Sequence, residues 1–238
     1  MATTIRHETP ARPVPPVRRG PVPAGRGSEE TIVSRYTAGA RVNHWLNAFA
    51  LILLVLSGLA LFHPALFWLT GLFGGGAATR AVHPWIGVVL LLTFAGLFVR
   101  FVRLNFPERS DVEWLSQPKA VLAGDEENLP EIGKYNAGQK FVFWSMSGLI
   151  LLLFVSGIGL WDQYFYEWTT IEQKRIAAVV HSIAALLAIL VFIVHVYAAI
   201  WVRGTVRAMT RGSVTGGWAW RHHRRWLRDE VAATKGDR

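Results

Sequence analysis

The sequence predicts an all-α integral membrane protein built as a bundle of four transmembrane helices. The composition is 52% hydrophobic with a formal net charge of +9, a combination that is typical of membrane proteins with basic loops. In addition, four stretches contain no Asp, Glu, Lys or Arg, and each can hold the roughly 20 apolar residues that cross a bilayer. These stretches are 42–79, 81–99, 141–161 and 176–202.

The N-terminal segment, residues 1–32, is expected to be a disordered extension. It contains the run PARPVPPVRRGPVPAGRG, which is rich in proline, glycine and arginine and offers no apolar stretch for a core. No apolar run of roughly 7–15 residues follows its charges, so we do not interpret it as a signal peptide. A basic tail can also bind nucleic acid, but four spans favour a role at the membrane surface.

The transmembrane domain is expected to cover residues 33–210. A basic cytoplasmic tail is expected at 211–238. His222 and His223 in this tail, and His7 in the N-terminal segment, are expected to be solvated. The first charge-free stretch is long enough for two helices. However, Phe62-His63-Pro64 and a glycine-rich run interrupt it, so one helix and a loop are expected. The four helices are predicted at about 43–63, 82–103, 139–161 and 177–203.

Basic residues fall mainly on one side of the predicted bundle. Segments 1–41, 100–140 and 203–238 contain 7, 6 and 9 Lys and Arg residues, against 3 in the two remaining loops. The positive-inside rule therefore places both termini and the central segment in the cytoplasm. The central segment also holds 7 acidic residues, so its side follows from helix alternation more than from its own charge.

Four histidines lie in or at the ends of the spans, where ionisable side chains are costly and point to function. His181 and His195 are 14 residues apart in the last span, so they leave nearly the same helix face about 21 Å apart. His83 opens the second span at the external level of His181. His44 opens the first span at the cytoplasmic level of His195. The topology thus pairs His83 with His181 and His44 with His195.

Two facing imidazoles inside a helical bundle predict a haem site, because imidazole is a common axial ligand of haem iron and bundle interiors house cofactors. Two such pairs predict two b-type haems. Since the chain has no cysteine, it can hold neither a thiolate-bound iron–sulfur cluster nor a haem attached through C-x-x-C-H. Several glycines either leave room for flat macrocycles or serve close helix contact: Gly58, Gly87, Gly96, Gly148, Gly157 and Gly159.

Other interpretations of the histidines remain open at this point. A single histidine in a spanning helix is more often a hydrogen-bonded structural residue than a ligand, although the joint pattern favours ligands. A transporter with a histidine proton relay is a second alternative, but the spans contain no acidic residue and no convincing repeat. A passive membrane anchor leaves the four histidines unexplained. His63 has no counterpart and is interpreted as an interfacial residue.

Several motifs resemble the gamma subunit of respiratory membrane-bound formate dehydrogenases, a di-haem cytochrome b. They are RYTAGARVNHW, AVHPWIG, GKYNAGQKFVFW, and the H-x13-H helix that ends in YAAIWVRGTVRAM. GKYNAGQK together with AVHP is more specific than H-x13-H, which recurs in other haem-bearing helices. The resemblance covers about residues 33–228 and leaves out the N-terminal extension.

This resemblance implies residue roles. The family's four haem-iron ligands fall on His44, His83, His181 and His195, with the pairing that the topology predicts.

A quinone, either menaquinone or ubiquinone, is also implied at the cytoplasmic end beside His195. Its contacts fall on Asn136 and Gly138, with Gln139 as a further candidate. An asparagine amide offers a quinone carbonyl both a donor and an acceptor, and a glycine lets the backbone approach closely. Without the resemblance, residues 135–138 would be interpreted as a turn leading into the third helix.

The resemblance also implies the function. The chain would anchor a formate dehydrogenase complex in the bacterial inner membrane as a multi-pass protein with both termini cytoplasmic. It would pass electrons from an external iron–sulfur beta subunit to the quinone, while a molybdenum or tungsten alpha subunit oxidises formate. No formate-oxidising catalytic residue is expected on this chain. A close alternative changes the partner to a nickel–iron hydrogenase or a thiosulfate/polysulfide reductase, and GKYNAGQK favours formate dehydrogenase.

Overall fold

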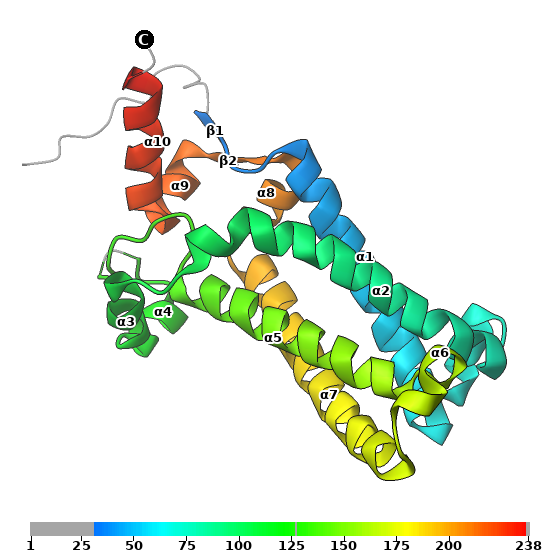
Figure 1. The fold of residues 1–238 in the computed structure, drawn as a ribbon. Helices are drawn as coiled ribbons and strands as arrows, with labels where there is room; N and C mark the ends of the chain where they lie inside the picture. Colours follow the sequence, from blue (N-terminus) through cyan, green and yellow to red (C-terminus); the bar gives the residue numbers. More distant parts are fainter. Residues whose placement is uncertain (1–30, 127, 237–238) are drawn as a thin grey trace, which may run out of the picture. The chain divides into compact units, whose positions relative to one another are not determined.

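The predicted four-helix membrane architecture is confirmed by a computed structural model, which describes residues 31–126 and 128–236. Nearly all of the extension expected at 1–32 lies outside the described residues. Four helices are long and apolar enough to cross a membrane (Figure 1). They are α1 (Ala38–Phe62), α2 (Gly76–Phe101), α5 (Ala137–Leu160) and α7 (Ile171–Trp201).

Each of these helices begins before its predicted start. At α1, α5 and α7 a capping side chain sets the first residue, whereas α2 follows Gly75 without a side-chain cap. Thr37 caps α1 by accepting a hydrogen bond from the backbone N–H of Ala40. Thr170 caps α7 in a capping box with Gln173. The first turn of α7 therefore includes the charged Glu172, which suits the positive end of the helix dipole. Apolar composition locates a span, whereas its first residue depends on the cap.

The connection between α1 and α2 differs from the expected loop. It forms a 3-10 helix, η1 (Pro64–Phe73), which ends where Gly74 and Gly75 adopt φ values of 89° and 99°. Only glycine takes such values at little cost, so these two residues let the chain reverse into α2. The exposed His63 accepts the backbone N–H of Ala65 at its Nδ1, 3.2 Å away, and thereby caps η1.

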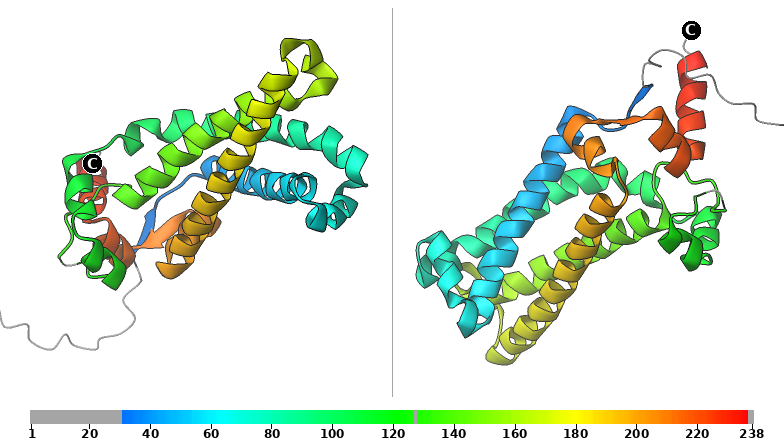
Figure 2. Two further views of the ribbon diagram at one scale, coloured as in Figure 1. Left: turned by 90° about the horizontal axis from the view of Figure 1, so that it is seen from below. Right: turned by 180° about the vertical axis from the view of Figure 1, so that it is seen from behind.

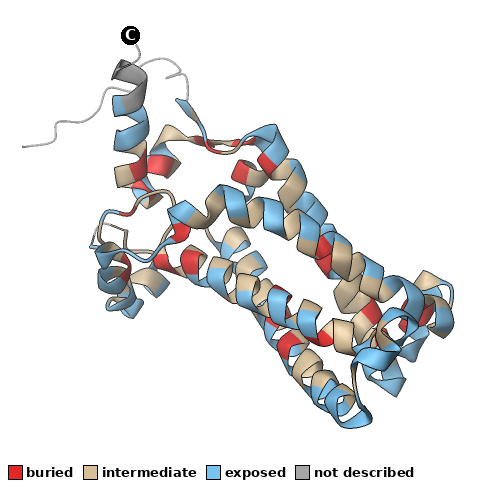
Figure 3. Cartoon of the chain, viewed as in Figure 1, coloured by how far each residue is buried: buried red, intermediate tan, exposed pale blue. Residues whose placement is uncertain are grey.

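The four spans form two antiparallel hairpins, α1 with α2 and α5 with α7, joined mainly by contacts between α2 and α5 (Figure 2). The core cluster of Ala50, Leu51, Leu90 and Ile150 draws on three of these helices. Large apolar side chains elsewhere on the spans, such as Leu92, are exposed, and exposed residues cover much of the bundle surface (Figure 3). Exposed apolar side chains of this kind suit contact with the hydrocarbon of a bilayer.

Smaller elements cluster at the two ends of the bundle. One end, here called the α10 end, carries α3 (Arg109–Leu115), α4 (Pro118–Ala123), α8 (Thr205–Arg211), α9 (Gly216–His222) and α10 (Arg224–Gly236) (Figure 1). The opposite end, the α6 end, carries η1, α6 (Asp162–Phe165) and η3 (Tyr166–Trp168). The short η2 (Val102–Asn105) continues α2.

The C-terminal segment is folded rather than a simple tail. Strand β1 (Ile32–Ser34) pairs antiparallel with β2 (Ser213–Thr215), with Val33 opposite Val214. Val214 also joins a buried cluster with Ala208, Ala219 and Trp226. A strand that precedes the first span thus pairs with one that follows the last span. The C-terminal segment is therefore held in place by residues far away in the sequence.

The expectation that His223 is solvated was wrong, since its exposure is 2%. Its Nδ1 lies 2.8 Å from the Gly133 carbonyl oxygen and its Nε2 lies 3.3 Å from Nη2 of Arg35. Burial, and then the charge of Arg35, lower the pKa of His223 to about 3. His222 is also partly buried, with Nδ1 2.8 Å from a carboxylate oxygen of Glu126. The flanking sequence is polar, but the fold supplies a buried environment.

Candidate haem and quinone sites

The structure brings the four intramembrane histidines together in two pairs. The ring centroids of His83 on α2 and His181 on α7 are 6.3 Å apart. Those of His44 on α1 and His195 on α7 are 6.2 Å apart. Each pair therefore joins two different helices, and α7 contributes one imidazole to each. The pairing expected from the topology is the pairing in space.

These separations match two imidazoles on opposite sides of one metal ion. A metal–imidazole bond is about 2.0 Å long and a ring nitrogen lies roughly 1.1 Å from its centroid, so the centroids of two such ligands lie about 6.2 Å apart. The rings are not stacked, since their planes make angles of 52° and 66°. In the described part of the chain, no cluster of three or more His, Cys, Asp and Glu forms. Haem is a cofactor in which the porphyrin supplies the other donors to the iron, so two imidazoles suffice on the protein side.

A cavity of about 730 Å³ opens beside the His83–His181 pair. Its size is within the usual range for bound organic ligands. All four spans line it, mostly with apolar side chains. A flat apolar cofactor with a central metal fits this lining, which includes Leu54, Leu90, Phe154, Leu186, Ile189, Pro84 and the two imidazoles.

Two of the glycines noted in the sequence make room for these imidazoles. A Cβ added to Gly58 would lie 3.5 Å from Cε1 of His83. A Cβ added to Gly157 would lie 3.4 Å from Cε1 of His181. Both distances are ordinary van der Waals contacts, so a methyl group would fit at either position, whereas a bulkier side chain would meet the imidazole. By contrast, no atom of the described residues lies within 4 Å of the corresponding position at Gly87 or Gly148.

Two serines that were not predicted as site residues lie beside the same imidazoles. The hydroxyl of Ser57 lies 2.7 Å from Nδ1 of His83, and the hydroxyl of Ser156 lies 3.0 Å from Nδ1 of His181. Ser57 is completely buried and Ser156 nearly so. A signal was present, because LLVLSGLALF at 53–62 and LLFVSGIGLW at 152–161 share a Ser-Gly at the same place.

The predicted quinone contacts lie at the beginning of α5. The side-chain oxygen of Asn136 accepts the backbone N–H of Gln139 at 2.9 Å, and the side-chain oxygen of Gln139 accepts the backbone N–H of Asn136 at 3.1 Å. The turn interpretation of this motif is therefore what the structure contains, in the form of a capping box. Gly138 lies against the Trp114 ring. The capping box leaves the NH₂ group of Asn136 without a partner among the described residues.

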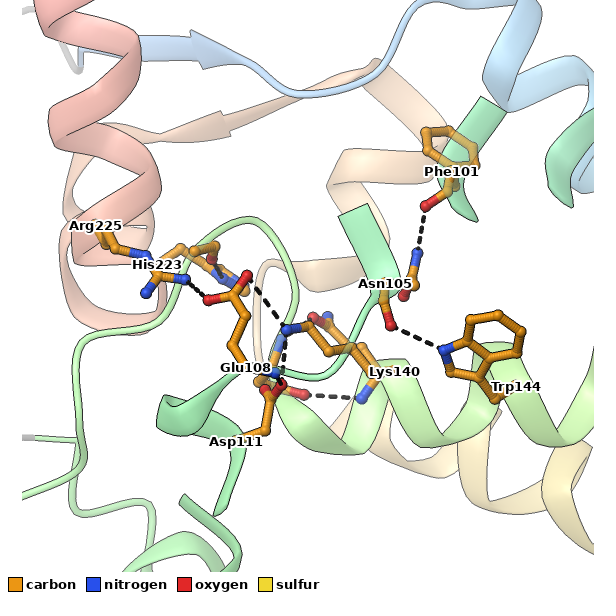
Figure 4. Close-up of polar contacts among 11 residues, drawn as sticks. Phe101, Asn105, Glu108, Asp111, Lys140, Trp144, His223 and Arg225 are labelled. Carbon is orange, nitrogen blue, oxygen red and sulfur yellow. Dashed lines mark hydrogen bonds and ion pairs between the residues drawn. The ribbon is translucent and has the colours of Figure 1, made fainter. Parts of the chain in front are cut away.

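A buried ion pair lies one turn further along α5 (Figure 4). Nζ of Lys140 is 2.8 Å from Oδ2 of Asp111 and 3.6 Å from Oε1 of Glu108. Lys140 and Asp111 are both buried. Arg225 of α10 pairs with the same Glu108, so this network links α10 to the start of α5.

Comparison with known proteins supports the cofactor suggested by this geometry. The family model described as prokaryotic cytochrome b561 matches residues 35–212, which include all four spans and all four histidines. This chain belongs to the prokaryotic cytochrome b561 family. Membership in this cytochrome family implies haem b as the cofactor.

Similar proteins narrow the relationship within the family. The cytochrome b556(fdo) subunit of formate dehydrogenase from Escherichia coli is 42% identical over 206 residues, covering 87% of this chain and 96% of that protein. The nitrate-inducible cytochrome b556(Fdn) subunit from the same species is 38% identical, covering 79% and 87%. The formate dehydrogenase cytochrome b556 subunit of Haemophilus influenzae is 37% identical, covering 86% of each. The resemblance predicted from the motifs is confirmed.

Proposed function

We propose that this cytochrome b is the membrane subunit of a formate dehydrogenase complex. It holds two b-type haems and passes electrons from an external iron–sulfur subunit across the membrane to a quinone near the cytoplasmic side. A separate molybdenum or tungsten subunit oxidises formate. The relatives, all subunits of formate dehydrogenases by name, support this partnership. The protein anchors the complex, and formate itself does not react on this chain.

One observation carries the proposal: two imidazole pairs have the separation that a shared iron requires, and they lie at two levels along one helix. His83 and His181 hold the first haem, and His44 and His195 hold the second. Iron held by two imidazoles supplies one-electron transfer without an open position for oxygen. The separation of 14 positions between His181 and His195 sets the spacing of the two centres at roughly 21 Å along α7.

The orientation follows from charge. We place the α10 end, with both termini, in the cytoplasm of a bacterium whose inner membrane holds the bundle. The basic residues of the flanking segments support this direction, since 22 Lys and Arg residues fall on this side against 3 on the other. The His83–His181 pair then faces the external partner, and the His44–His195 pair faces the cytoplasm.

The quinone site lies at the start of α5 in this proposal. Asn136 directs its NH₂ group to a quinone carbonyl while its oxygen remains in the capping box. Gly138 allows the backbone of this turn to approach the ring, and Gln139 stabilises the turn. The buried Lys140 next to this turn is held by Asp111 and by the half-exposed Glu108. The quinone in this proposal is menaquinone or ubiquinone.

Haem content of the purified protein tests the proposal. We expect a reduced b-type spectrum with two haems per chain. His195→Ala is expected to leave one haem and abolish quinone reduction, and His83→Ala is expected to leave the other haem and block electron entry. His63→Ala, which removes an exposed histidine outside both pairs, is the matched control and should keep both haems. A wild-type chain without haem would end the proposal.

The subunits that co-purify in mild detergent test the partnership separately. An iron–sulfur protein and a molybdenum or tungsten protein with formate-oxidising activity are expected. A nickel–iron hydrogenase in their place would overturn the formate assignment while leaving the haem assignment intact.

A further inference from the structure

The two imidazole pairs differ in what their second ring nitrogens contact. At the His83–His181 pair, each Nδ1 lies within hydrogen-bond distance of a serine hydroxyl, Ser57 for one and Ser156 for the other. At the other pair, Nδ1 of His44 is buried without a hydrogen-bond partner. No hydrogen bond to the ring of His195 is found among the described residues either. The asymmetry therefore involves both members of each pair.

The neighbouring backbone carbonyls determine which group donates in the two serine–histidine hydrogen bonds. The hydroxyl of Ser57 lies 2.7 Å from the Leu53 carbonyl oxygen, and that of Ser156 lies 2.7 Å from the Leu152 carbonyl oxygen. A carbonyl only accepts, so the single hydroxyl hydrogen of each serine must lie between these two oxygens. Only the hydroxyl lone pairs are then left for the imidazole.

The histidine must consequently donate. With Nδ1 of His83 and of His181 carrying the hydrogen, the Nε2 of each neutral ring has a free lone pair. This is the tautomer that binds a metal through Nε2, and the serines fix both it and the ring orientation before any cofactor arrives. Gly58 and Gly157, next to the serines, leave the space in which these rings sit.

The arrangement occurs twice in the bundle. In each hairpin, a Ser-Gly on the first helix holds the histidine of the second, with 26 residues separating Ser57 from His83 and 25 separating Ser156 from His181. The flanking sequences are alike, LLVLSGLALF and LLFVSGIGLW. Two equivalent pairs of contacts from two separate hairpins are hard to attribute to packing alone.

We infer that Ser57 and Ser156 are positioning residues that lock His83 and His181 as metal ligands and distinguish this site electronically from the His44–His195 site. The inference rests on the proposed haem function. An imidazole whose far N–H is hydrogen-bonded is a stronger electron donor to its metal. A stronger donor stabilises the oxidised metal, so the His83–His181 site has the lower reduction potential and electrons descend from it to the other site.

A redox titration of the full chain in membranes, followed by the absorption of its b-type components, tests this inference. The component that disappears in His83→Ala marks the site in question, and in the wild type it should have the lower midpoint potential. Ser57→Ala and Ser156→Ala should each raise that potential by the equivalent of about tenfold in the electron-transfer equilibrium, which is ~59 mV for a one-electron couple. The double variant should show roughly the sum, and the other component should not move.

Two variants separate this role from a merely structural one. Ser147→Ala removes a hydroxyl that donates to the Phe143 carbonyl on the same helix but contacts no imidazole, so neither potential should change. Ser156→Thr keeps the hydroxyl and should restore the wild-type potential. Loss of only the marked component in the double variant, with the other component intact, would also support positioning.

Different results would overturn the proposed function and this inference. A wild-type chain without haem would overturn the proposed function. Two haems in the wild type, with potentials that do not change in the serine double variant, would overturn this inference and leave the proposed function standing.

Discussion

Polar side chains have different roles in the membrane bundle and at the α10 end. In the spans, large apolar residues face outward, and four half-buried histidines lie in two pairs whose ring planes make angles of 52° and 66°. At the α10 end, charged residues are plentiful, yet several are buried as structural contacts, including Arg35, Lys140 and Asp111. Buried polar groups at the α10 end therefore tie segments together, whereas two of those in the spans, Ser57 and Ser156, contact the histidines of a candidate cofactor site.

The largest effect of a substitution is expected at the His83–His181 site, the candidate cofactor site in the bundle. Gly157→Leu would direct a bulky side chain at His181, whose ring atoms lie 3.4 and 3.7 Å from the position of the added Cβ. We expect loss of one of the two haems, because the imidazole cannot keep its position. Gly157→Ala adds only a methyl group at van der Waals contact and should retain both.

Pyridine haemochrome quantification of purified variants measures this effect. Equal haem content in the Leu and Ala variants would show that the space beside His181 does not control cofactor binding. The α10 end should keep its fold in both.

The buried ion pair at the α10 end should show the next largest effect. Lys140→Ala leaves the carboxylate of Asp111 buried without its cation, which we expect to lower the free energy of unfolding by about 3 kcal/mol. The paired replacement Lys140→Met with Asp111→Leu should recover most of this loss, because it leaves no uncompensated charge. Denaturant unfolding in detergent micelles, followed by tryptophan fluorescence, checks both. A double variant as unstable as the single one would show that the network has a role beyond pairing charges.

Acid should weaken the α10 end through His223. Its pKa is lowered from 6.5 to about 3 by burial and by the neighbouring charge of Arg35. The unfolded chain therefore binds a proton on this side chain below about pH 6.5, whereas the folded chain does not. The stabilisation is complete above that pH and decreases by at most about 1.4 kcal/mol per pH unit as the pH falls towards 3.

Thermal unfolding of the wild type and of His223→Gln between pH 8 and pH 4.5 measures this contribution. The glutamine variant should show a flatter pH dependence. Identical slopes would mean that other groups dominate acid unfolding.

The smallest effect is expected at the α6 end. Lys174 and Asp162 form an ion pair 2.5 Å long, but the aspartate side chain is 61% exposed. Solvent screens such a pair, so Lys174→Met should change the free energy of unfolding by less than about 1 kcal/mol. A larger loss in the same unfolding assay would indicate that Lys174 contributes more through its cation–π contact with Tyr166 than through the ion pair. Its Nζ lies 4.4 Å from the centre of the Tyr166 ring.

The sequence by itself determined the number of spans and the grouping of the four histidines. Lipid cannot hydrogen-bond, so each span must appear as an uninterrupted apolar run that composition reveals. Helix alternation then gives each histidine its level, and a partner on another helix follows. The same local patterns gave approximate helix ranges, but the caps at Thr37 and Thr170 set the first residues.

Only the tertiary structure decided which polar residues touch one another. Ser57 and Ser156 are ordinary helix serines until the hairpins bring His83 and His181 against them. His223 looks solvated until β1 pairs with β2 and carries Arg35 to it from 188 residues away. Hydrogen bonds act over about 3 Å. Sequence separation carries no information about such contacts once the chain has turned back on itself.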